Sequence, residues 1–164
     1  MGLLVLGAVF VTGCVGQEQS GPPAARVTTW MQGAGGGSAI GTVEVDSRNI
    51  DHALAHHDPP SAIRTVCALL TNDAETAIGN LPSPDTLLTD ELNAAFEDAA
   101  AAGDDCYSGA GGNVHLLRRS ASERAKLAPL LSSVVARITE VTGHTPTTAT
   151  TAPQAGPGDP FSGT

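Results

Sequence analysis

The stretch from Ser61 to Gly79, SAIRTVCALLTNDAETAIG, decides the fold of this 164-residue chain. Its apolar residues recur three and four positions apart, which is the spacing of one buried face of an α-helix. The residues of this face are Ile63, Val66, Cys67, Leu70, Ala74, Ala77 and Ile78. Ser61 suits the N-cap, and Gly79 is typical of a helix end. The stretch therefore predicts an amphipathic helix that carries Cys67 on its core side.

A second helix with the same periodicity is expected after the loop Leu81-Pro82-Ser83-Pro84. The residues of its face are Leu92, Ala95, Phe96, Ala99, Gly103, Cys106 and Tyr107. This helix begins either at Ser83 or at Thr89. The start at Thr89 is favoured because, at 1.5 Å per residue, it brings Cys106 closer to the level of Cys67 in a helical hairpin. A disulfide requires that proximity, since the two Cα atoms must lie about 4.4–6.8 Å apart.

Two further helices are expected before this hairpin. A short one runs from about Ala24 to Ala34 and ends at the glycines 35–37. A longer one follows Ser38, although the segment TVEV at residues 42–45 leaves a strand as the alternative. The apolar face of the longer helix contains Ile40, Val43, Ser47, Ile50, Leu54 and His57.

The last helix is expected from about Asn113 to Thr142, closed by Gly143. Its predicted apolar face contains Val114, Leu117, Ala121, Ala128, Leu131, Val135 and Ile138. Pro129 lies inside this stretch. Because an interior proline removes a backbone hydrogen bond, the sequence predicts a bend near Lys126 or a division into two helices.

Together these patterns predict an all-α fold: a small four-helix bundle with one disulfide and a disordered C-terminal tail. The expected bundle domain spans residues 24–143, and the Thr-, Pro- and Gly-rich tail spans residues 144–164. Aromatic residues make up only 3% of the chain, so the core should bury little apolar area. A domain with so thin a core benefits from a covalent link.

The N-terminal end holds an apolar run, Leu3 to Val11, which continues into Val11-Thr12-Gly13-Cys14. The run is too short to span a bilayer but has the length of the apolar region of a signal peptide. The segment resembles the lipobox signal of bacterial lipoproteins. The resemblance implies removal of residues 1–13, lipidation of Cys14, a tether over residues 14–23, and a location on the extracytoplasmic face of the membrane. Met1-Gly2 lacks the usual basic residues, so a buried apolar element of a cytosolic protein is the alternative.

Lipidation of Cys14 would leave Cys67 and Cys106 as an even pair in an exported chain. Such pairs usually oxidise outside the cytoplasm, so a disulfide between them is expected. In the chain-entropy description, a bond closing a loop of this length contributes about 4 kcal/mol. Two free buried thiols are the alternative.

The formal net charge of −9 disfavours nucleic acid as a partner. Four basic residues do lie in one predicted helix, where a solvated helix face is the expected role. They are Arg118, Arg119, Arg124 and Lys126. Abundant Ala, Gly and Arg with a single Lys suggest a GC-rich genome, such as that of an actinobacterium.

Asp51-His52-Ala53-Leu54-Ala55-His56-His57-Asp58 is the one cluster with metal-ligand chemistry. His52 and His56 are four residues apart, so on a helix both imidazoles can reach one ion. The spacing lacks the glutamate of a zinc-protease motif, and a polar helix end is the favoured interpretation. No set of nucleophile, base and acid is visible, so the chain is not expected to be an enzyme or to need a cofactor.

These observations favour a lipid-anchored, non-enzymatic envelope protein with a structural or protein-interaction role. The alternative is an envelope metal-binding protein that uses His52 and His56.

Overall fold

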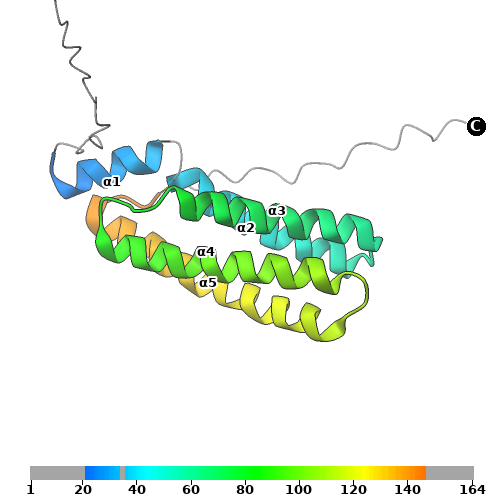
Figure 1. Ribbon diagram of the computed structural model, residues 1–164. Helices are drawn as coiled ribbons and strands as arrows, with labels where there is room; N and C mark the ends of the chain where they lie inside the picture. Colours follow the sequence, from blue (N-terminus) through cyan, green and yellow to red (C-terminus); the bar gives the residue numbers. More distant parts are fainter. Residues whose placement is uncertain (1–20, 34–35, 147–164) are drawn as a thin grey trace, which may run out of the picture.

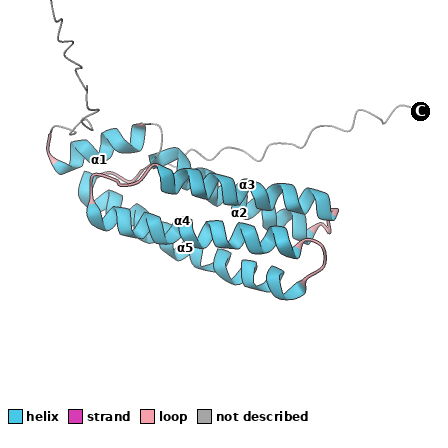
Figure 2. Ribbon diagram, viewed as in Figure 1, coloured by secondary structure: helices cyan, strands magenta, loops and turns pink. Residues whose placement is uncertain are grey.

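The computed structural model describes residues 21–33 and 36–146, and within these ranges all regular structure is helical (Figure 2). These ranges contain five helices rather than the four of the predicted bundle, because the short helix expected before the bundle is formed as well. They are α1 (Pro23–Gln32), α2 (Gly36–Ala55), α3 (Pro60–Gly79), α4 (Thr86–Gly109) and α5 (Val114–Thr142). The predicted all-α class is thus confirmed, and the strand alternative at residues 42–45 is wrong.

Helices α2 to α5 run up and down in chain order, and α1 lies across the end of the bundle where α5 finishes (Figure 1). Short connections make consecutive helices antiparallel neighbours. Helix α4 packs along most of both α3 and α5, whereas α2 and α5 touch at few points. The bundle is therefore tightly closed on the α3–α4 side and loosely closed between its first and last long helices.

The start of α4 differs from both predicted starts. The helix begins at Thr86, and the N-cap Asp85 accepts a hydrogen bond from the backbone N–H of Leu88 at 2.8 Å. Ser83 and Thr89 bond to each other across this turn, with the Ser83 N–H 2.9 Å from Thr89 Oγ1. A carboxylate at the N-cap satisfies an otherwise free helical N–H, which explains the choice of Asp85.

Helix α5 is a single helix of 29 residues that passes through Pro129, so the predicted division into two helices is wrong. Pro129 and Ala125, whose carbonyl loses its helical partner, are both exposed, and water can satisfy that carbonyl. The predicted ends are confirmed: Asn113 caps the first turn with its side chain, and Gly143 closes the helix at a φ of 73°.

The buried face of α5 is rotated from the predicted one. Leu131 and Ile138 are buried as expected, but Val114, Ala121 and Ala128 are exposed. The buried positions are Ser120, Arg124, Leu127, Leu131, Val134 and Ile138, which alternate four and three apart. Two further residues of predicted faces also lie outside the core: His57, which follows the end of α2, and Tyr107 of α4.

Small residues bring α3 and α4 close together. A Cβ added to Gly103 would lie 2.8 Å from Thr71 N and 2.9 Å from Cys67 O. Real Cβ atoms do not approach backbone so closely, so glycine permits this contact. Alanines fill much of the adjoining core: Ala74, Ala77, Ala95, Ala99 and Ala102.

Candidate functional site

The predicted disulfide between Cys67 and Cys106 is present and joins α3 to α4. The two Cα atoms are 5.6 Å apart, and both side chains are fully buried. Because the bond lies beside the Gly103 contact, it locks α3 and α4 together where their backbones approach closely.

Cys14 and the rest of the predicted signal and tether up to residue 20 lie outside the described residues, as does the tail from residue 147. The prediction for Cys14 therefore stays a prediction. None of the helices described here is long and apolar enough to cross a membrane.

The candidate metal ligands His52 and His56 lie together at the C-terminal end of α2. Their rings stack at a centroid distance of 3.9 Å with 17° between the planes, and His56 Nδ1 lies 2.8 Å from His52 O. Nearly parallel rings direct their in-plane lone pairs side by side rather than toward one point. In the part of the chain that the structure describes, no group of three or more His, Cys, Asp or Glu side chains is placed to hold an ion.

Three arginines of α5 form ion pairs that attach this helix to the rest of the bundle. Their partners come from α4, from α2 and from the turn before α4. The pairs are Arg119 with Asp105, Arg124 with Asp51, and Arg137 with Asp85. The predicted solvated face is correct for Arg118, Arg119 and Lys126, which are exposed, and wrong for Arg124, which is buried.

Asp85 connects the start of α4 to α5. Besides capping Leu88, its carboxylate accepts hydrogen bonds from Arg137 Nε at 3.0 Å and from Arg137 Nη2 at 2.8 Å. The bond from Arg137, with a further contribution from the Leu88 N–H, lowers the pKa of Asp85. A bidentate arginine fixes the position of that carboxylate.

A groove of about 510 Å³ lies between α2 and α5, two helices that touch at few points. We call it the α2–α5 groove. Its apolar lining residues are Ile40, Leu127, Ala128, Leu131 and Val135. Its polar lining residues are Glu44, Ser47, Arg48, Asp51, Arg124 and Ser132.

Arg124 bridges the two helices at one end of this groove. Its guanidinium pairs with the carboxylate of Asp51, and Arg124 Nη1 donates to the backbone carbonyl of Ser47 at 3.3 Å. The Arg124 side chain is only 5% exposed, whereas that of Asp51 is 68% exposed. Arg124 Nε is buried and has no hydrogen-bond partner in the described structure. A buried cation thus depends on one exposed counter-ion.

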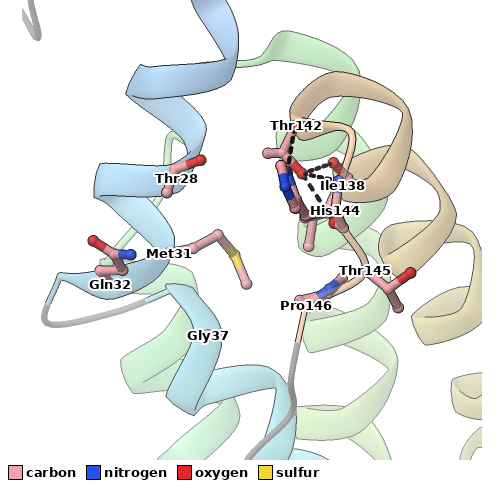
Figure 3. Close-up of a pocket in the computed structure, with 9 residues that line it drawn as sticks. All are labelled: Thr28, Met31, Gln32, Gly37, Ile138, Thr142, His144, Thr145 and Pro146. Atoms are coloured by element: carbon pink, nitrogen blue, oxygen red, sulfur yellow. Dashed lines mark hydrogen bonds between the residues drawn. The ribbon is translucent and has the colours of Figure 1, made fainter.

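A second hollow, of about 330 Å³, lies where α1 and the start of α2 meet the end of α5 (Figure 3). The Met31 side chain extends from α1 into this hollow, with its end toward Pro146. The polar groups there bond to one another: Thr142 Oγ1 donates to Ile138 O at 2.8 Å, and His144 Nδ1 lies 2.9 Å from Thr142 O. These contacts close the end of α5.

A buried carboxyl group, Asp46, faces α3 from the core side of α2. Burial, and next the neighbouring carboxyl of Asp73, raise the pKa of Asp46 to about 7. The sequence did not predict the burial of Asp46 or of Arg124, because a buried helix face is recognised from its apolar residues. The available signal for Asp46 was its spacing of three from Val43 and four from Ile50, both buried.

Comparison of the chain with protein-family models, with curated proteins and with solved structures finds no match.

Proposed function

We propose that this protein is an extracytoplasmic lipoprotein, anchored to the membrane by lipid on Cys14. In this proposal its helical bundle is a non-enzymatic structural or protein-interaction module of the cell envelope.

The buried disulfide between Cys67 and Cys106 is the observation that carries the proposal. Disulfides persist in oxidising compartments and are rare in the cytoplasm of mesophiles. Export requires a signal, and the apolar run that ends in Val11-Thr12-Gly13-Cys14 has the residues of one. The disulfide and this segment thus support the same location independently.

The arrangement of charges supports a non-enzymatic role. The arginines of α5 pair with carboxylates of neighbouring helices, as expected for groups that hold a bundle together. The core of the described domain is built mainly from aliphatic side chains, with Phe96 its one buried aromatic residue. These features suit a rigid module carried on a tether.

The test is metabolic labelling with an alkyne-bearing fatty acid in a bacterial host that processes lipoproteins. The wild-type chain should be labelled, shortened and membrane-bound, and Cys14→Ser should abolish the label and leave a precursor. The matched control is the double variant Cys67→Ser, Cys106→Ser, which keeps Cys14 and should still be labelled. Label that survives Cys14→Ser would refute the anchor.

A further inference from the structure

We propose that the α2–α5 groove binds an anionic amphiphile, with an alkyl chain along its apolar walls and a carboxylate or phosphate head on Arg124. This site is independent of the lipid anchor proposed for Cys14.

The dimensions of the groove suit a single alkyl chain. It follows α2 from Ile40 to Asp51 and α5 from Val135 to Arg124, and eleven helical residues span about 16 Å. Its volume of about 510 Å³ lies within the range of ligand sites, roughly 300–1,000 Å³.

The two ends of the groove also differ in charge, and the Glu44–Arg48 pair lies between them. Because the two helices are antiparallel, Ile40 and Val135 lie at one end, whereas Asp51 and Arg124 lie at the other. Burial of an apolar chain contributes roughly 25 cal/mol per Å² of surface removed from water. A molecule with one apolar end and one charged end matches this order of side chains.

The charged end of the groove favours an anionic ligand, because the Arg124 guanidinium is held in place and the Asp51 carboxylate is not. Arg124 is buried and bonded to the Ser47 carbonyl, so it cannot turn into solvent. A buried charge needs a partner, and losing that partner is costly. Asp51 is largely exposed and loses little on returning to water. An incoming carboxylate or phosphate can therefore replace Asp51 at the guanidinium.

Arg48 offers a second, weaker contact beside the same groove. Its guanidinium pairs with Glu44 of its own helix at 2.6 Å, and both side chains are about half exposed. Exposed pairs of this kind contribute little to stability, so Arg48 is free to reorient toward a second oxygen of the head group.

The experiment is calorimetric titration of the full chain carrying Cys14→Ser, with its disulfide formed, below the micelle concentration of each probe. Dodecanoate and dodecyl phosphate should bind one per chain with a Kd tighter than about 100 µM. Dodecyltrimethylammonium, which has the same tail and the opposite charge, should bind at least tenfold more weakly. Equal binding of the cationic probe would overturn the proposal.

Two variants, both at exposed positions, locate the site. Asp51→Asn removes the internal competitor, so it should tighten dodecanoate binding severalfold. Ala128→Trp adds an indole to the exposed wall of the groove and should abolish binding, whereas Ala125→Trp, on the same helix and outside the groove, should not. Unchanged binding in both Asp51→Asn and Ala128→Trp would place the probe elsewhere and refute the proposal.

One further titration distinguishes two natural sources of an anionic amphiphile, a membrane lipid and a free single-chain amphiphile. A short two-tailed phosphatidic acid binds as well as dodecyl phosphate if the ligand is a membrane lipid, and fails to bind if the groove admits one free fatty chain. Either result supports an anionic amphiphile. Failure of Cys14 labelling would leave this site untouched, and failure of the titration would leave the anchor untouched.

Discussion

Two helix interfaces of this bundle are held by opposite means: the one between α3 and α4, which we call the α3–α4 seam, and the one between α2 and α5, which we call the α2–α5 seam. The first is held by a disulfide and by backbone contact at Gly103. The second leaves a groove that Arg124 bridges through the exposed carboxylate of Asp51. A covalent bond and small-residue packing make one side of the bundle rigid without large side chains. That rigidity lets the opposite seam remain partly open, as a binding surface requires.

Of the changes that test this comparison, removal of the disulfide should have the largest effect on the free energy of unfolding. The double variant Cys67→Ala, Cys106→Ala should lose about 2–5 kcal/mol of unfolding free energy, because the unfolded chain regains the freedom that the link removed. Urea denaturation of the oxidised protein and of the variant measures the difference. Reduced wild type should unfold at the same urea concentration as the variant. A loss below about 0.5 kcal/mol would show that packing alone holds the hairpin.

The next largest difference should come from placing a larger side chain at each seam, because stability should fall at the α3–α4 seam and hardly change at the α2–α5 seam. Gly103→Ala should cost about 1–3 kcal/mol, since its Cβ would press on backbone atoms of α3. Ala128→Trp adds a far larger group to the exposed wall of the α2–α5 groove and should change stability by less than about 0.5 kcal/mol. Thermal melting of both variants tests the comparison.

The control for Gly103→Ala is Gly79→Ala. Gly79 is also helical, but a Cβ added there meets no atom within 4 Å. It should be neutral or slightly stabilising, because alanine has the higher helix propensity. Equal losses at Gly103 and Gly79 would mean that the α3–α4 seam is not tight.

The contrast between the seams also explains what the sequence could predict. Helix α3 and its disulfide were predictable because one uninterrupted apolar stripe carries Cys67, and local periodicity is visible in the sequence. The start of α4 was not, because Asp85 is selected partly by Arg137, which lies far along the chain. Local capping rules contain no term for that partner.

The α2–α5 groove could not be predicted from the sequence for a related reason. Ser120 and Arg124 occupy buried positions of α5, so the apolar pattern appeared to shift onto Ala121 and Ala128. Arg124 can be buried because Asp51 of α2 reaches it across the seam. The fold class follows from the helical periodicity of the apolar residues, whereas this site depends on where two distant polar residues meet.

A buried carboxyl, Asp46, lies at a third interface, between α2 and α3, and makes the stability of the fold depend on pH. Its carboxyl is buried, one of its oxygens has no hydrogen-bond partner among the described residues, and its pKa is raised to about 7 by burial and by Asp73. In the unfolded chain the same carboxyl titrates near 3.8. Between these values the folded state binds a proton that the unfolded state does not, so this group destabilises the fold as the pH rises.

Asp46→Asn should therefore stabilise the protein at pH 8 by roughly 1 kcal/mol, because the amide imitates the protonated carboxyl and carries no charge. The gain should shrink as the pH falls and be less than half as large at pH 5, because the two states differ in protonation only between about 3.8 and 7. At pH 5 the carboxyl of Asp85 is still ionised, since its pKa is lowered. Urea midpoints of wild type and variant at pH 5, 6.5 and 8 measure the trend. The matched control is Asp90→Asn, which makes the same chemical change at an exposed carboxyl of α4 and relieves no buried charge. A gain at pH 5 as large as that at pH 8 would mean that relief of crowding, rather than removal of a charge, stabilises the variant.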